Sequence, residues 1–280
     1  MSAGNDLHAD IISRALTSFP EQTSYVEYEN LASLRRLRVY DRLEQRFAGK
    51  PLQEARIALG QLGIREDQVI EMVAASDPTG FYGIVTGTFS EQSLKRNGIS
   101  QGSAMPALGS RLFCPGSGPC VLFLEDSVAA FGSLTQLAEI AQGHDGSTTR
   151  LSSNRTVVSL LNSTDSQAPV RGVLIGGQLE IAISDVLRNW TGWNSGWSQL
   201  CGNVRNAGYS VKFDYTAHVA ATLECRSAMS ATLLLQMFRL LGTVPSVSIP
   251  GGDAGAGIPF RNLHASSAGS TIVVKADTRY

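Results

Sequence analysis

A serine between two glycines is the first pattern in this sequence that could do chemistry. Gly98-Ile-Ser100-Gln-Gly102 matches the G-x-S-x-G nucleophile elbow, in which a sharp strand-to-helix turn exposes the serine hydroxyl beside an oxyanion hole. Here a short predicted helix precedes the motif and Pro106 follows it closely. The context therefore favours a flexible turn, and Ser100 is a weak candidate for a catalytic nucleophile.

Histidine is the second residue type that could supply acid–base or metal chemistry. The four histidines are scattered, and no two of them have the spacing of a zinc-binding pair. His218 and His264 both fall on predicted strands of the C-terminal half, where folding could bring them close together. A catalytic or metal-binding role would still need a third ligand or an orienting carboxylate. Two exposed histidines on a strand face are therefore the simpler interpretation.

A glycine-rich segment, Gly251 to Gly257, superficially resembles a phosphate-binding loop. It lacks the Lys-Ser/Thr ending, and no predicted strand leads into it and no helix leaves it. The acidic residues of the chain are dispersed, and they form no recognisable pair for glycoside hydrolysis. We therefore predict no cofactor and no metal, and we favour a non-enzyme over an enzyme.

Two cysteines flank a short loop with strong turn chemistry, Cys114-Pro-Gly-Ser-Gly-Pro-Cys120. Two prolines and two glycines between apolar segments favour a tight hairpin, which would place the two sulfurs opposite each other. The spacing differs from that of a redox motif, and no second pair lies nearby to complete a zinc site. We predict a disulfide, which indicates an oxidising, extracytoplasmic compartment. Two buried free thiols are the alternative.

Three tryptophans could form a binding surface. Trp190, Trp193 and Trp197 are spaced three and four residues apart, so they share one face of the helix predicted over 179–200. Packing in the core is the ordinary interpretation of such a stripe. The sharper one is an exposed aromatic surface that docks a partner or a membrane interface, because tryptophan is enriched in both.

A basic stripe is the second candidate binding surface. Arg38, Arg42 and Arg46 lie four residues apart on a helix predicted over 31–47. Because acidic residues interleave with them, a solvated face with local ion pairs is one interpretation. Attraction to anionic lipid head groups is the functional one.

The composition of the 280-residue chain excludes several classes of protein. A hydrophobic content of 43% is ample for a packed core, and 23 basic against 24 acidic residues argue against a dedicated nucleic-acid binder. No segment approaches the run of about 18 apolar residues that a membrane-spanning helix needs. The polar N-terminus shows no signal peptide. An extracytoplasmic location therefore assumes that an export signal or anchor is missing from this sequence.

The clearest structural pattern runs from Tyr209 to Gly242. Apolar and polar residues alternate over 209–215 and again over 217–225, which predicts a β-hairpin. Ser227 is expected to cap the helix that follows, and Gly242 to end it. The apolar stripe of this helix is predicted to face the core. It comprises Met229, Leu233, Met237 and Leu240, and it is widened by Leu234, Phe238 and Leu241.

Both halves of the chain repeat one order of elements: strand, helix, strand, strand, helix, strand, strand. The elements begin between positions 24 and 120 in the first half and between 169 and 270 in the second. We interpret this order as an internal duplication. It predicts an α+β fold of two similar halves, each a mainly antiparallel sheet with helices on one face. The expected divisions are a helical lead over 1–23 and halves over 24–150 and 151–280.

Four stretches of sequence resemble a loosely defined group of uncharacterised bacterial proteins: SFPEQTSYVEYENLASLRRL, VIEMVAAS with GFYGIVTGTFS, VLFLEDSVAAFGSLTQLAEIAQ, and GYSVKFDYTAHVAATLECRSAMSATLLLQMFRLL. The resemblance covers most of the chain, from about Ser18 to Asp277. It implies an envelope-associated protein with an N-terminal membrane segment, a repeated α+β body and no assigned activity. That group offers no catalytic residues to carry over. This sequence departs from it in lacking the N-terminal hydrophobic segment.

Two functions of different classes follow from these observations. The first is a non-enzymatic binding or scaffolding protein of the bacterial cell envelope. Its partner would be an unknown protein or envelope component rather than nucleic acid, with peripheral membrane contact through the missing anchor. The alternative is a hydrolase with a site between the two halves that uses Ser100, His218 or His264.

Overall fold

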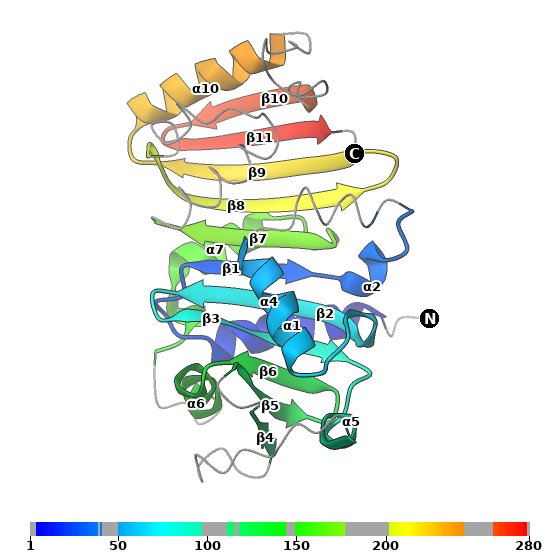
Figure 1. Cartoon of the computed structure of the whole chain (residues 1–280). Helices are drawn as coiled ribbons and strands as arrows, with labels where there is room; N and C mark the ends of the chain where they lie inside the picture. The colour runs from blue at the N-terminus through cyan, green and yellow to red at the C-terminus, as the bar shows by residue number, and fades with distance from the viewer. Residues whose placement is uncertain are drawn as a thin grey trace, which may run out of the picture. The chain divides into compact units, whose positions relative to one another are not determined.

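The computed structural model confirms an α+β fold built on antiparallel strand pairs (Figure 1). It describes residues 4–38, 40, 50–96, 111–114, 118–143, 149–176, 202–243 and 260–278. The chain divides into two compact units. Unit 1 comprises Met1–Arg36 and Lys50–Val158, and unit 2 comprises Leu37–Gly49 and Ser159–Tyr280.

The sheet of unit 1 has the strand order β1-β2-β3-β6-β5-β4, and its neighbouring strands are antiparallel. The strands are β1 (Tyr25–Glu29), β2 (Val69–Asp77), β3 (Gly80–Gly87), β4 (Leu112–Phe113), β5 (Cys120–Glu125) and β6 (Val128–Gly132). The helices are α1 (Gly4–Ser18), α2 (Leu31–Leu34), α4 (Lys50–Gln61), α5 (Glu91–Arg96), α6 (Leu134–Gly143) and the short helices η1 (Glu66–Gln68) and η3 (Leu151–Ser153). Helix α7 (Arg155–Ser163) crosses the division between the units.

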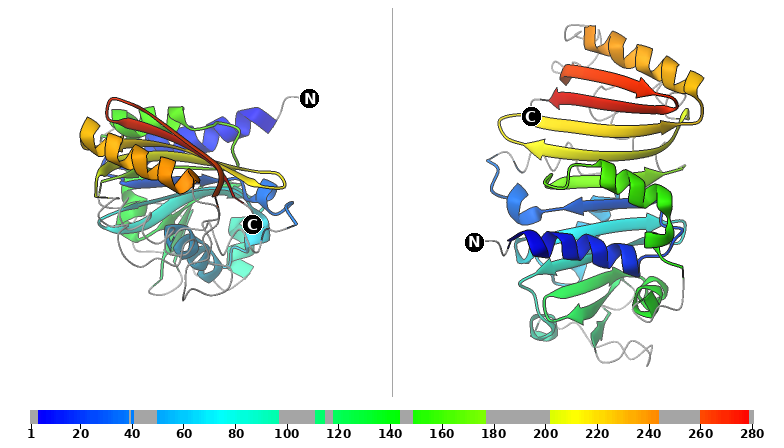
Figure 2. Two further views of the ribbon diagram at one scale, coloured as in Figure 1. Left: turned by 90° about the horizontal axis from the view of Figure 1, so that it is seen from above. Right: turned by 180° about the vertical axis from the view of Figure 1, so that it is seen from behind.

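Helices cover both faces of the unit 1 sheet, so the prediction of helices on one face is wrong for this unit (Figures 1 and 2). Helix α4 lies on the face of Glu29, whose Oε2 accepts a hydrogen bond from Arg56 Nη2 at 3.3 Å. The strand register places Tyr82 on the opposite face. There Phe19, just beyond α1, packs edge-on against the Tyr82 ring with centroids 5.2 Å apart.

Strand β1 shows why the sequence misses the second covered face. Its glutamates alternate with apolar residues, which is typical of one face turned toward water. In the structure all five residues of β1 are buried. Glu27 accepts a hydrogen bond from Tyr25 Oη at 2.5 Å, and Tyr28 on the other face donates to Glu71 at 2.8 Å. Burial of a carboxylate is tolerated only with such partners, and the sequence pattern does not reveal them.

The predicted helix over 31–47 ends early. Its start is well specified, because Asn30 Oδ1 accepts a hydrogen bond from Ser33 N at 2.8 Å, but α2 stops at Leu34. The Arg35 guanidinium turns away to donate to the main-chain carbonyls of Glu66 and Val69. These bonds to η1 and β2 are long-range contacts that helical spacing cannot indicate. Residues 41–49 lie outside the described part of the chain.

The sheet of unit 2 has the strand order β10-β11-β9-β8-β7, again with antiparallel neighbours. The strands are β7 (Val170–Ile175), β8 (Val204–Phe213), β9 (Ala217–Cys225), β10 (Phe260–Ala268) and β11 (Thr271–Thr278). Strand β11 keeps the simple alternation of a sheet with one covered face: Ile272, Val274 and Ala276 are buried, whereas Val273 and Lys275 are exposed.

Helix α10 (Ala228–Thr243) follows β9 and packs chiefly along β10, the outermost strand of this sheet (Figure 1). Ser227 Oγ accepts a hydrogen bond from Ser230 N at 3.1 Å, which confirms Ser227 as the N-cap. Gly242 does not end the helix as predicted. It lies inside α10, where a Cβ atom would come 3.1 Å from the carbonyl oxygen of Leu263. The missing side chain thus permits a close approach of helix to strand.

Candidate functional site

The structure does not bring the predicted catalytic histidines together. His218 lies on β9 and His264 on β10, with β11 between them. The register pairs His218 with Asp277 and His264 with Lys275, so the two positions are also offset along the strands. Ser100 lies outside the described residues.

His218 is held between two carboxylates. Its Nδ1 lies 2.7 Å from Asp277 Oδ1, and its Nε2 lies 3.0 Å from Asp214 Oδ2. A catalytic base needs a free ring nitrogen that faces its substrate. Both nitrogens of His218 are already engaged, so this arrangement is a structural cluster rather than a prepared base.

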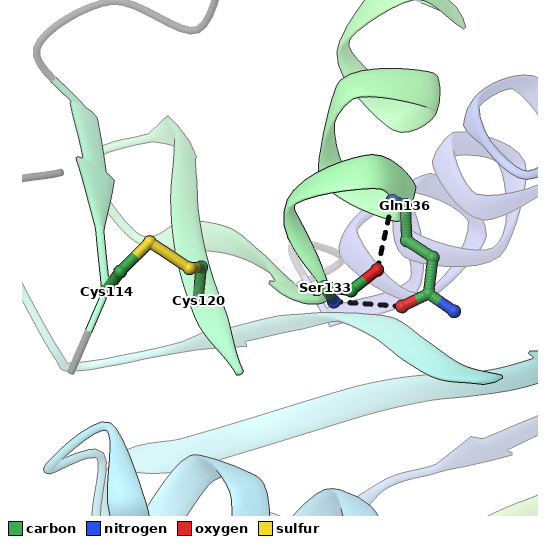
Figure 3. The surroundings of a disulfide bond; sticks show 4 residues. All are labelled: Cys114, Cys120, Ser133 and Gln136. Atoms are coloured by element: carbon green, nitrogen blue, oxygen red, sulfur yellow. Dashed lines mark hydrogen bonds between the residues drawn. A yellow bond between two sulfur atoms is a disulfide. The ribbon is translucent and has the colours of Figure 1, made fainter. Parts of the chain in front are cut away.

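The disulfide between Cys114 and Cys120 is present as predicted (Figure 3). Its two Cα atoms lie 4.3 Å apart, and it joins the residue after β4 to the first residue of β5. Nearby, α6 begins with a reciprocal cap: Ser133 N donates to Gln136 Oε1 at 2.9 Å, and Gln136 N donates to Ser133 Oγ at 3.3 Å. Both features fix the outer part of the unit 1 sheet, where the edge strand β4 is only two residues long.

The two predicted binding surfaces fall largely outside the described residues. Trp190, Trp193 and Trp197 all do, as do Arg42 and Arg46. Arg38 is described, and it is an exposed turn residue beyond the end of α2 rather than part of a continuous helix. The basic helical stripe is therefore not available as a described site.

A different surface, on α10, is the candidate binding site among the described residues. Met229, Leu233 and Leu240 are 75%, 56% and 65% exposed, although their spacing predicts a core-facing stripe. At about 100° per residue they fall within an arc of roughly 40° on one side of the helix. We call these three residues the outer face of α10. Large apolar side chains gathered on one exposed face are typical of an interaction surface.

The opposite side of α10 supplies the contact with the sheet. Ala231, Leu234 and Leu235 are buried there. The helix is thus apolar on two opposite sides, a pattern typical of a helix that is covered all round. The sequence could have revealed this, since Leu234 and Leu235 lie on the side of the helix away from Met229 and Leu233 and do not simply widen one stripe. Periodicity alone does not say which side the sheet covers.

The charged residues in the sequence of α10 and just before it are all of one sign. Arg239 is the only ionisable residue in the helix, and Arg226 lies just before it; both are exposed. No aspartate or glutamate occurs in the sequence from Cys225 to Gly252. The outer face is therefore an apolar strip flanked by cations.

The described residues also bear on metal binding and on membrane spanning. Among the described residues, no group of three or more histidine, cysteine, aspartate or glutamate side chains could hold a metal ion. In the same part of the chain, every helix is too short or too polar to cross a membrane.

Comparison with known proteins gives the fold and no activity. No family model matches the sequence, and no curated protein matches it either. Two solved structures, crystal forms III and I of TP0453, each align with a TM-score of 0.56. The first has 7% identity over 95% of this chain and 94% of that chain; the second has 8% identity over 94% and 92%. At this identity the likeness concerns the fold alone.

Proposed function

We propose that this protein is a non-enzymatic binding or scaffolding protein of the bacterial cell envelope, and that the outer face of α10 rests on an anionic membrane surface. The observation that carries the proposal is the exposure of Met229 and Leu233 on a helix whose other side packs on β10. Full burial of a large apolar side chain is worth about 1.5–3 kcal/mol of transfer free energy, and a side chain that faces water does not gain it. Contact with a bilayer would recover part of it.

The charges near the outer face of α10 favour an anionic lipid surface over a second copy of this chain as its binding partner. Arg226 and Arg239 flank the apolar strip, and no acidic residue occurs within the helix. Each arginine held near an anionic lipid surface contributes about 1 kcal/mol of attraction. A second copy of this chain would instead bring the same cations face to face, which is unfavourable.

The length of α10 sets the geometry of the contact. Its 16 residues extend about 24 Å, less than the hydrocarbon core of about 30 Å. A helix with one apolar and cation-flanked exposed side binds in the plane of the interface. The proposed contact is therefore peripheral and needs no spanning segment.

The compartment is supported by the disulfide. A Cys114–Cys120 bond persists in an oxidising environment such as the periplasm, and the sequence resemblance described above implies the same location. The hydrolase alternative gains no support from His218, whose ring nitrogens are both bound to carboxylates.

We also propose that the two units arose by duplication of one block. The order β1-β2-β3-β6-β5 in unit 1 parallels β7-β8-β9-β11-β10 in unit 2. In both, a helix separates the third strand from the later strands: α5 follows β3, and α10 follows β9. This pairing matches β10 and β11 with β5 and β6 rather than with the strands predicted to begin at positions 111 and 120, and it leaves β4 without a counterpart among the described strands of unit 2. An experimental structure in which these two sets of strands cannot be superimposed would refute the duplication.

The membrane contact is tested by co-sedimentation of the whole chain with vesicles. We expect binding to phosphatidylcholine vesicles that contain phosphatidylglycerol, and weaker binding to pure phosphatidylcholine or at high salt. Leu233→Glu removes an apolar anchor and adds a repelled charge, so it should lower the partition coefficient about tenfold or more. Arg239→Gln should lower it about fivefold, and only at low salt.

Ile57→Glu is the matched control, because Ile57 is 62% exposed on α4 of unit 1. It should leave vesicle binding unchanged. Equal losses from Ile57→Glu and Leu233→Glu, or wild-type binding that ignores lipid charge, would refute the membrane contact. Sedimentation velocity without lipid tests whether a second copy of the chain binds the outer face instead. A dimer that Leu233→Glu abolishes would make the outer face an interface between two copies.

A further inference from the structure

The His218 cluster carries a second inference, independent of the membrane contact. The ring receives a carboxylate at each nitrogen, with Asp277 at 2.7 Å and Asp214 at 3.0 Å. A neutral imidazole has one N–H and can donate to only one of them, whereas the protonated ring donates to both. The geometry therefore fits the imidazolium form.

The two carboxylates belong to parts of unit 2 that are distant in sequence. Asp214 lies in the β8–β9 turn, where its Oδ1 also accepts a hydrogen bond from Thr216 N at 2.8 Å. Asp277 lies near the end of β11, and its Oδ2 accepts from Asn262 Nδ2 of β10 at 2.7 Å. Asn262 has a φ of 51°, at a point where the β10–β11 register shifts. The imidazolium thus joins the turn to the ends of two further strands.

The other charged groups around His218 come from three strands. Lys212 of β8 is paired with it in the register, but this ammonium lies 2.5 Å from Asp165. On β11, Lys275 is paired with His264 of β10. Tyr215, in the turn, is 97% exposed. Two carboxylates in direct contact thus dominate the surroundings of the ring.

We propose that His218 is a pH-responsive clamp, which holds the β8–β9 turn to the end of β11 while the ring is protonated and releases the turn when the proton leaves. The bond to Asp214 is the one lost. Asp277 is held by Asn262 within the strands and is 28% exposed, whereas Asp214 lies in a turn and is 59% exposed. A neutral ring keeps its single N–H on the better fixed partner.

The direction of the response follows from the same contacts. Hydrogen bonds to Asp214, and then to Asp277, raise the pKa of His218 above its ordinary value, against a smaller opposing effect of burial. The clamp is therefore closed below the ordinary histidine pKa of about 6.5 and opens as the pH rises through the raised pKa of His218. The opening of the clamp can therefore be followed in solution on the intact chain by changing the pH.

The experiment is an NMR titration of the whole protein that follows the His218 ring and the Thr216 amide. We expect His218 to titrate above the histidines of the urea-unfolded chain. Across that titration, the protection factor of the Thr216 amide, corrected for the intrinsic exchange rate, should fall about two- to fivefold, as for one exposed ion pair. In His218→Gln the protection factor should not change over the same range.

His264→Gln serves as the control and should preserve the transition. If His218→Gln does not fold, Asp214→Asn replaces it: this variant should lower the pKa of His218 and abolish the transition at Thr216. His218 titrating at or below the unfolded value would overturn the clamp. So would a Thr216 transition that persists when either His218 or Asp214 has been replaced.

Discussion

The two units differ in how the rest of the chain covers their sheets. In unit 1, every residue of β1 and β6 is buried, and α1 and α4 lie on opposite faces. In unit 2, β11 alternates between buried and exposed residues, and α10 leaves apolar side chains in water. The strands of the two sheets nevertheless follow corresponding orders, β1-β2-β3-β6-β5 in unit 1 and β7-β8-β9-β11-β10 in unit 2. Among the described residues, the same strand order thus has fully buried strands in unit 1 and partly exposed ones in unit 2, and unit 2 carries both proposals made above.

The largest expected effect contrasts a core residue of unit 1 with the outer face of α10. Phe131 is fully buried on β6, with its ring centroid 5.8 Å from that of Phe81. Phe131→Ala should lower the free energy of unfolding by about 3–5 kcal/mol, since it leaves a cavity. Leu233→Ala should lower it by less than about 0.5 kcal/mol. Urea unfolding followed by circular dichroism measures both, and similar losses would show that the outer face is part of a core.

A smaller effect is expected from the disulfide, and it should be confined to unit 1. Replacing Cys114 and Cys120 together by serine removes the constraint on a short loop of the unfolded chain, worth about 2 kcal/mol. Hydrogen exchange should report lower protection in β5 and β6 and unchanged protection in β8 and β9. Adding reductant to the wild type should give the same result. Equal loss in both units would mean that they unfold together.

The smallest expected effect is the pH dependence of unit 2. His218 has a raised pKa, so its stabilisation is complete below the unfolded value of about 6.5 and is lost as pH rises through the folded pKa. The pKa of Asp214 is lowered by His218, and that of Asp277 by Asn262 and then His218. Their stabilisation is complete above about 3.9 and is lost as pH falls through the folded values.

This pH dependence is tested by measuring the midpoint of urea unfolding at a series of pH values that spans the titration of His218, Asp214 and Asp277. The wild type should show a plateau with a decline on the alkaline side, and His218→Gln should lack the alkaline decline. Hydrogen exchange should confine the difference to unit 2. An alkaline decline of the same size in His218→Gln would assign it to another group.

Local chemistry made part of the structure predictable. The β2–β3 hairpin turns at Asp77-Pro-Thr-Gly80, a sequence typical of turns, where Asp77 Oδ1 accepts a hydrogen bond from Thr79 N at 2.7 Å. The Cys114–Cys120 disulfide and the Ser227 cap are equally local, since the atoms that form them lie within a few residues of each other. Such features follow from residue type and spacing without knowledge of the fold.

Features that depend on distant contacts were not predictable in the same way. The side of α10 that is covered depends on β10, which begins 17 residues after the helix ends at Thr243. The Arg35 guanidinium, just after the end of α2, donates to main-chain carbonyl groups of η1 and β2, and these contacts are not visible in the local sequence pattern. The candidate site was missed for this reason: its residues were recognised as an apolar stripe and assigned to the wrong side of the helix.

The close approach at Gly242 has a consequence for how α10 can act. Main-chain groups along the outer edge of β10 are open to pairing with another chain unless something shields them, and α10 lies against this strand. Pulling the helix away would bare a nine-residue template for aggregation. The proposed attachment to a lipid surface is therefore expected to leave α10 packed against β10, so the fold would not need to rearrange on binding.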